Sequence, residues 1–176
     1  KLARGTVIES ELDRGHGPVG TVIIQDGTLK IQDPFISGMT FGRVRAMIDD
    51  KGTRIQIAPP ATPVLVVGFQ DVPHGGDRFI VTTEERYAKE LSKFRQEKLR
   101  EREALKSART TLEDLYSKIG ETEKVFLNVI VKGDVRGTID AIVEALKKMS
   151  TDSVEVQITH SGVGAITETD VNLAMA

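Results

Sequence analysis

Residues 19–31, VGTVIIQDGTLKI, decide how the first half of the chain folds. Apolar and polar side chains mostly alternate through residues 19–25 and again through residues 29–31, as in strands that bury one face. Asp26 and Gly27 lie between the two runs, and this dipeptide can adopt the positive φ angles of a two-residue hairpin turn. The stretch therefore predicts short strands joined by tight turns.

Similar short runs lie on both sides of this stretch, at residues 6–11, 35–37, 42–48, 54–58, 64–68 and 78–81. Glycines separate many of them, and the region shows no helical period. Strands this short must hide their edges, and closure into a barrel is the usual way to do so. We predict a small antiparallel β-barrel over residues 1–83.

The next segment, residues 84–109, carries a charge at nearly every second position and contains no glycine or proline. This pattern predicts a helix, and Thr82 and Glu85 have the spacing of a capping box at its start. Apolar residues are scarce in its middle, so we expect most of the helix to face solvent. At about 1.5 Å per residue it would be a spacer that holds two domains roughly 40 Å apart.

The pattern changes again over residues 110–176. A second helix is predicted to start at Thr110 or Thr111. Residues 125–131 then read as a strand that is apolar on both faces, residues 138–149 as an amphipathic helix and residues 154–159 as another strand, which together predict a βαβ unit with parallel strands under a helix. A sheet of only two strands is marginal, so we expect this α/β domain to continue past Ala176. The predicted fold class is therefore a small antiparallel β-barrel joined by a long charged helix to an incomplete α/β domain.

Composition excludes several classes of protein. The 176 residues are 39% hydrophobic and 28% charged, which is typical of a soluble folded chain, and the apolar runs are too short to cross a bilayer. With no cysteine, the chain cannot form disulfides, zinc–thiolate sites or a thiol nucleophile. The three histidines are scattered, so no metal site is predicted. The net charge of −2 means that any contact with nucleic acid must come from a local patch.

Two glycine loops, residues 133–137 and 161–165, follow predicted strands and precede predicted helices, where a phosphate can be held. Neither has the lysine and serine or threonine that end a P-loop, and Asp134 would repel a phosphate in the first. His160 precedes the second loop without a partner motif for acid–base catalysis. We expect both loops to be structural and predict no catalytic residue, with a nucleotide-binding βαβ enzyme as the alternative.

A basic stripe on the barrel is the stronger candidate. Strict alternation in residues 42–48, GRVRAMI, would point Val44, Ala46 and Ile48 into the barrel and Arg43, Arg45 and Met47 outward. By the same logic Leu29 and Ile31 would oppose Lys30, and Ile55 and Ile57 would oppose Arg54. The predicted RNA-binding residues are therefore Lys30, Arg43, Arg45 and Arg54, since guanidinium groups on a rigid sheet suit the phosphates of folded RNA. An ordinary solvated barrel face remains the alternative.

Longer stretches carry a resemblance to a known family. Residues 5–22, 26–33, 42–50 and 58–64 are similar to the barrel that follows the GTP-binding domain of translational GTPases. With LNVIVKGDVRG at residues 127–137 and HSGVGAITETD at residues 160–170, the chain resembles bacterial translation initiation factor two over essentially its whole length. It departs from the family at Gln32 and Gly133, where glycine and alanine are usual, and at Arg136, where glutamine is usual.

The resemblance implies a function for the whole protein. Members of the family are cytoplasmic GTPases that use GTP and magnesium, bring formylated initiator tRNA to the small ribosomal subunit and promote joining of the large subunit. This chain shows no P-loop or switch segment, so we expect no cofactor in it and no enzymatic activity. Its barrel would contact the small subunit and its rRNA, while the helix and α/β domain relay the nucleotide state. We expect a monomer with no membrane partner; the alternative to an RNA-binding part is a scaffold whose helix pairs with a partner.

Overall fold

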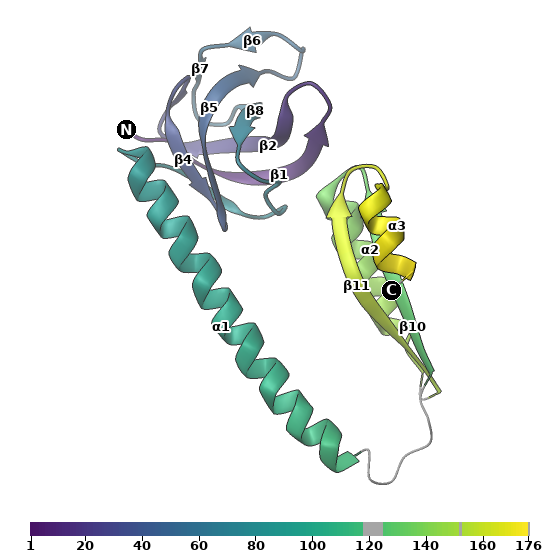
Figure 1. Cartoon of the computed structure of the whole chain (residues 1–176). Helices are drawn as coiled ribbons and strands as arrows, with labels where there is room; N and C mark the ends of the chain where they lie inside the picture. Colours follow the sequence, from purple (N-terminus) through teal and green to yellow (C-terminus); the bar gives the residue numbers. More distant parts are fainter. Residues whose placement is uncertain (118–124, 152, 176) are drawn as a thin grey trace.

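The computed structural model describes residues 1–117, 125–151 and 153–175, which form a β-barrel, a long helix and a small α/β unit (Figure 1). The strands of the barrel region are β1 (Arg4–Asp13), β2 (Gly17–Asp26), β3 (Leu29–Lys30), β4 (Pro34–Ser37), β5 (Thr40–Ile48), β6 (Arg54–Ile55), β7 (Ile57–Ala58), β8 (Pro63–Phe69) and β9 (Arg78–Val81). They are followed by α1 (Glu85–Ser117), β10 (Val125–Gly133), α2 (Arg136–Lys148), β11 (Val154–Val163) and α3 (Glu168–Met175). Within the described residues, none of these helices has both the length and the apolarity that crossing a bilayer requires.

The barrel closes as predicted. Its strands follow the order β4, β9, β1, β2, β8 and β5, and β5 pairs with β4 to complete the ring. Every neighbouring pair is antiparallel. Strand β6 extends β5 outside the ring, and β3 pairs with β7 as a separate short ribbon. Closure leaves the six ring strands with no free edge, which confirms the predicted small antiparallel barrel.

Three phenylalanines fill the centre of the barrel. The ring centroid of Phe35 lies 4.7 Å from that of Phe69 and 4.5 Å from that of Phe79. Aliphatic side chains from most strands surround them, so the core draws on the whole ring. Each large apolar side chain buried in this way stabilises the fold by about 1.5–3 kcal/mol.

The predicted alternation along β5 holds only for its first half. Val44 is buried and Arg43 and Arg45 are exposed, but Met47, predicted to point outward, is fully buried. The register with β8 slips between Gly42 and Ala46, so extra residues of β5 bulge against Gly68 and the inward face changes parity. Gly68 permits the bulge because it has φ of +126°, and a Cβ there would lie 2.0 Å from the carbonyl oxygen of Arg43.

Two further predictions about the barrel are wrong. Ile57 is 56% exposed because the chain bends at Gln56, between β6 and β7, and this bend breaks the expected alternation. Gly27 does adopt a positive φ of +71°, but the strands on either side of it do not pair, since β3 pairs with β7. The hairpin lies instead between β1 and β2, where Asp13 Oδ1 accepts hydrogen bonds from the backbone N–H groups of the turn. These bonds lower the pKa of Asp13.

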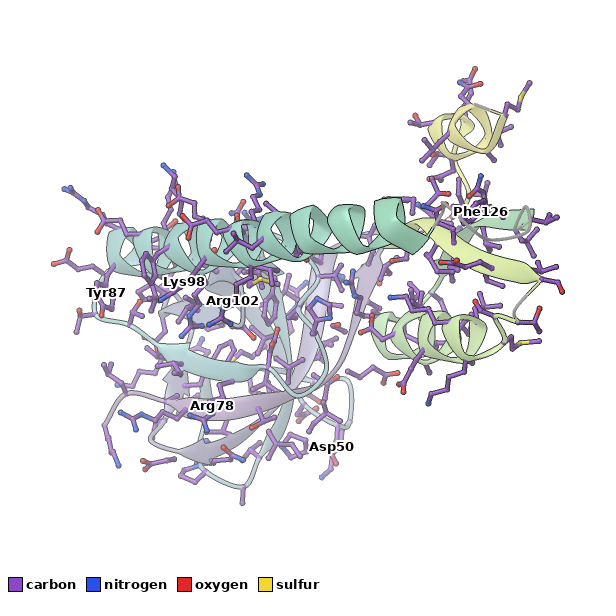
Figure 2. The ribbon with its side chains drawn as sticks, turned by 90° about the horizontal axis from the view of Figure 1, so that it is seen from below. Asp50, Arg78, Tyr87, Lys98, Arg102 and Phe126 are labelled. Carbon is purple, nitrogen blue, oxygen red and sulfur yellow. The ribbon has the colours of Figure 1, made fainter. Side chains whose placement is uncertain are left out.

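The long helix α1 packs against the barrel through its first half. Ala88 and Ser92 are buried, the Ser92 hydroxyl donates to the carbonyl of Met39, and Arg95 donates to the carbonyl of Gly38 at 2.6 Å. The apolar side chains that recur at helical spacing here are largely exposed, at 59% for Tyr87 (labelled in Figure 2) and 57% for Phe94. The predicted capping box is absent as well, because the Thr82 hydroxyl donates to the carbonyls of Pro34 and Glu84.

The helix is also longer than predicted and continuous. It runs through Thr110 and Thr111, where a second helix was expected, and ends at Ser117. Its 33 residues span about 50 Å. The helix does not keep the two units apart, however, because the α/β unit folds back and lies beside the barrel (Figure 1). Glu11 of β1 forms an antiparallel bridge with Val135, just before α2.

The α/β unit contains the predicted parallel pair of strands. Val125 of β10 pairs with Val154 of β11, and the ladder continues to Gly133 and Val163. Helix α2 buries Ile139 against the sheet. The start of β10 is not covered as predicted, since Phe126 is 50% exposed (Figure 2) and its neighbours Val125 and Leu127 are similarly exposed. The described helices contact the later part of the strands, where Val131 is buried.

Candidate nucleic-acid interface

Two of the four predicted cations lie on β5, a third on its partner β6 and the fourth on β3, which pairs with β7. Arg43 and Arg45 project from the outer face of β5 and are exposed, as predicted. Arg54 lies on β6, opposite Ile48 at the far end of β5. Lys30 is exposed at the end of β3, and the chain just after it joins β5 through hydrogen bonds between Val44 and residues 32 and 33. Arg43 and Arg45 thus lie on β5, and Lys30 and Arg54 lie on or next to segments that hydrogen-bond with it; we call Lys30, Arg43, Arg45 and Arg54 the β5 basic stripe.

One member of the stripe already has a partner. The guanidinium of Arg43 donates from Nε and Nη2 to Oε2 of Glu85, at 2.9 and 2.6 Å. Glu85 is the first residue of α1, so this ion pair links the barrel to the helix. Arg43 is thus partly neutralised, which leaves Arg45 as the member of β5 best placed for a phosphate.

Acidic side chains near the stripe are engaged in local turns. Asp33 accepts a hydrogen bond from the backbone N–H of Lys30 at 2.9 Å. Asp49 accepts from the backbone N–H groups of Lys51 and Thr53 in the turn between β5 and β6. These carboxylates hold the backbone that carries the cations, but they also reduce the positive potential of this face.

The turn after Lys30 is also joined to β5 through the backbone. Gln32 has φ of +71°, an unusual conformation for a residue other than glycine, and it is one of the positions where the resembled family usually has glycine. Its N–H donates to the carbonyl of Val44 at 2.8 Å, which joins the segment after Lys30 to β5. The departure at Gln32 therefore retains the turn at the cost of some backbone strain.

The first glycine loop serves packing and a local turn, and no side chain caps the start of α2. A Cβ on Gly133 would lie 2.9 Å from Cγ1 of Ile139, so the glycine allows α2 to approach β10 closely. Asp134 Oδ1 accepts a hydrogen bond from the N–H of Val135 at 2.9 Å. In the second loop, the N–H of Gly164 donates to the carbonyl of Gly133 at 2.8 Å. Each loop thus supports the other, and this geometry gives no support to the nucleotide-binding alternative.

An ion pair between a half-buried lysine and a buried aspartate closes the end of this sheet. Lys132 Nζ of β10 lies 3.2 Å from Oδ2 of Asp170 in α3. Asp170 also accepts hydrogen bonds from the N–H and hydroxyl of Thr167, both at 2.8 Å. The bonds from Thr167, aided by Lys132, lower the pKa of Asp170 to about 2. This is a helix cap tied to a strand, and its ion pair has no local sequence signal because Lys132 lies 38 positions before Asp170.

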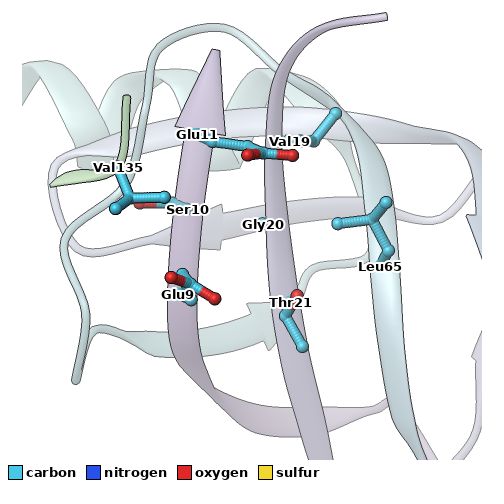
Figure 3. A pocket seen from close by; sticks show the side chains of 8 residues that line it. All are labelled: Glu9, Ser10, Glu11, Val19, Gly20, Thr21, Leu65 and Val135. Atoms are coloured by element: carbon cyan, nitrogen blue, oxygen red, sulfur yellow. The ribbon is translucent and has the colours of Figure 1, made fainter. Parts of the chain in front are cut away.

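Another candidate site lies against the wall of the barrel. A small pocket of about 110 Å³ lies over β1, β2 and β8, with Val135 at its rim (Figure 3). It is too small for a nucleotide, since ligand pockets usually have volumes of about 300–1,000 Å³. Among the described residues, no three histidine, aspartate or glutamate side chains are grouped so that they could hold a metal ion.

A polar cluster between the two units escaped sequence reasoning entirely. Arg136 Nη2 lies 3.1 Å from His74 Nε2, and His74 Nδ1 lies 3.2 Å from Oδ2 of Asp140. His74 belongs to the loop before β9, whereas Arg136 and Asp140 belong to α2, 62 and 66 positions later in the chain. No local spacing pattern signals such a contact.

Comparison with known proteins covers the whole chain. The family model described as elongation factor G domain 2 matches residues 2–82, and the model described as translation-initiation factor 2 matches residues 101–176. Among curated relatives, translation initiation factor IF-2 of Thermodesulfovibrio yellowstonii is 53% identical over 174 residues, which are 99% of this chain and 23% of that protein. The IF-2 of Geobacter sulfurreducens is 54% identical over 176 residues, covering 100% of this chain and 20% of the relative.

One solved structure with some similarity to this chain is that of an archaeal protein. GDP-bound aIF5B from Aeropyrum pernix has a TM-score of 0.49 and 23% sequence identity, over 99% of this chain and 28% of that one. The chain thus spans about a fifth to a quarter of the length of the curated relatives described above. Essentially the whole chain matches translation initiation factor IF-2 sequences, at 53% and 54% identity. The chain therefore belongs to the translation initiation factor IF-2 family, within the translational GTPases.

Proposed function

We propose that this chain is a non-catalytic part of a translation initiation GTPase, and that its barrel binds the RNA of the small ribosomal subunit. The observation that carries the proposal is the β5 basic stripe, which presents cations from a closed and rigid barrel. Rigid placement suits RNA, because a folded RNA is recognised largely through its shape and phosphates. Family membership supports the choice of ribosomal RNA as the partner.

Within the whole protein, this part would support the GTPase without binding the nucleotide itself. GTP and magnesium would bind elsewhere, since these 176 residues have no P-loop motif and their glycine loops are engaged in packing and backbone hydrogen bonds. The protein would act as a cytoplasmic monomer that promotes binding of formylated initiator tRNA to the small subunit and joining of the large one. Helix α1 and the α/β unit would relay the nucleotide state.

Charge reversal at Arg45 tests the RNA role. The Arg45→Glu variant should bind purified small ribosomal subunits more weakly, and the slope of log K against log salt should fall by about 1 for each lost phosphate contact. Arg78→Glu is the matched control, because Arg78 is an exposed cation on β9, outside the stripe (Figure 2). Equal binding by the wild type and the Arg45→Glu variant at every salt concentration would contradict the proposal.

Calorimetry tests the nucleotide-binding alternative separately. The chain is titrated with GTP, ATP and NAD in turn, and we expect no heat of binding at micromolar concentrations. Micromolar affinity for any of the three would contradict the non-catalytic assignment, whatever the result with ribosomal subunits.

A further inference from the structure

The cluster of His74, Arg136 and Asp140 connects two units that the chain joins only through a long helix. His74 is contributed by the barrel, and the other two residues lie one turn apart on α2. Arg136 Nε also lies 3.4 Å from Oδ1 of Asp140, an ion-pair contact without hydrogen-bond geometry, so each of the three side chains contacts the other two. The cluster lies at the same junction as the backbone bridge between Glu11 and Val135.

Donor chemistry fixes the protonation of the imidazole in this arrangement. A guanidinium has no lone pair to offer, so Arg136 must donate and Nε2 of His74 must accept. Nε2 therefore carries no hydrogen, and the ring proton is on Nδ1, from which it is donated to Asp140. The observed contacts require a neutral imidazole in the Nδ1–H tautomer.

The rest of the junction contributes little apolar contact. Leu12 is close to Gly164 but remains 46% exposed, and Val135 is only half-buried. The side chains of His74 and Asp140 are 38% and 48% exposed. Units of one chain move relative to each other unless a large hydrophobic interface joins them, and this junction is small and polar.

The helix, by contrast, is held to the barrel by several contacts. The Arg43–Glu85 ion pair, the Ser92 hydroxyl and the Arg95 guanidinium all join α1 to β4, β5 or the turn between them. Loss of the His74 cluster would leave α1 in place and free the α/β unit alone.

We propose that His74, Arg136 and Asp140 form a releasable latch that holds the α/β unit against the barrel, so that the chain exchanges between a docked and an undocked state. The latch selects the docked state through two directional hydrogen bonds to one imidazole. This proposal does not depend on RNA binding by the β5 basic stripe.

Spin-label distances test the latch in the full 176-residue chain. Because the chain has no cysteine, Lys51→Cys and Lys147→Cys create a unique label pair, with one exposed site on the barrel and one on α2. We expect a dominant narrow distance distribution in the otherwise unchanged chain. His74→Ala or Asp140→Ala should shift the docked-to-undocked ratio by about fivefold to tenfold, which is the net effect of losing a typical hydrogen bond.

His16→Ala is the matched control. Like His74, His16 is a half-exposed turn histidine that contacts a carboxylate, but its partner Asp13 lies in the same turn. The control should keep the distance distribution of the parent. Distributions that are unchanged in both the His74→Ala and Asp140→Ala chains would overturn the proposal.

The histidine tautomer provides a test that needs no destabilising variant. The ¹⁵N chemical shifts of the His74 ring at neutral pH should identify a neutral ring protonated at Nδ1. A ring protonated at Nε2, or at both nitrogens, would overturn the latch even if the variants failed to fold.

Discussion

Arg43 of β5 donates two hydrogen bonds to one carboxylate oxygen of Glu85 in α1, at 2.9 and 2.6 Å. This ion pair joins the predicted RNA-binding face to the start of the long helix. It gives Arg43 two competing roles, as a phosphate ligand and as an anchor of α1. Removing one partner at a time separates them.

Glu85→Gln should free Arg43 for RNA. Both side chains of the pair are nearly half exposed, so the loss in unfolding free energy should stay below about 1 kcal/mol. Binding to small ribosomal subunits should tighten, and its salt slope should steepen by about 0.7–1 as one more cation meets phosphate. Glu84→Gln removes the same charge one residue earlier and serves as the control. Equal binding by the two variants would show that Arg43 does not reach the RNA.

Ala88→Leu should weaken the docking of α1. Ala88 is fully buried at the contact with the barrel, and overpacking a filled site costs about 1–3 kcal/mol. Tyr87→Leu, next to it on the exposed face, should change the unfolding free energy by less than about 0.5 kcal/mol. Urea denaturation of both variants measures the difference. If the two variants lose the same stability, the face assigned to the barrel is wrong.

The helix face illustrates what sequence reasoning could and could not reach. The charge pattern predicted the helix, and Tyr87 and Phe94 lie on one stripe of it at helical spacing, yet both side chains are exposed in the structure. The true contact uses Ala88 and Ser92, whose small size and polarity give no hydrophobic signal. Because Ser92 binds the barrel carbonyl of Met39 and Ala88 contributes only a buried methyl group, a composition pattern cannot reveal this contact without the partner surface.

In the barrel, too, local alternation could not predict the register between neighbouring strands. Alternation predicted that Arg43 and Arg45 face outward, and it failed two residues later at Met47, after the bulge. The bulge depends on Gly68 of the neighbouring strand, which is distant in the sequence. The sequence could not predict how the two units are arranged for a similar reason, since His74 and Arg136 meet only after the chain has folded back.

Gly68→Ala should be among the most damaging substitutions in the barrel. The residue has φ of +126°, and the new Cβ would lie 2.0 Å from a backbone oxygen that cannot move away. We expect a loss of more than about 2 kcal/mol in unfolding free energy, since strain and backbone displacement add. Gly52→Ala is the control, because Gly52 has φ of +78° but no atom within 4 Å of the new Cβ. Similar losses at both positions would mean that the bulge at β5 adds nothing beyond the unfavourable φ.

Asp170 should make the α/β unit sensitive to acid. Hydrogen bonds from Thr167, with the nearby Lys132, lower its pKa from 3.8 to about 2, so the folded state favours the carboxylate. Because the pKa is lower in the folded state, the stabilisation is fully present above about pH 4 and is lost as the pH falls through about 2.

Asp170→Asn keeps an oxygen acceptor but loses the charge. Amide hydrogen exchange at Thr167, whose N–H donates to this carboxylate, should therefore be faster in the variant than in the wild type at pH 5, and the ratio should approach one near pH 2. Asp50→Asn, in an exposed turn of the barrel, is the control and should leave the ratio unchanged. A ratio that stayed constant from pH 5 to pH 2 would show that the carboxylate charge does not stabilise the cap.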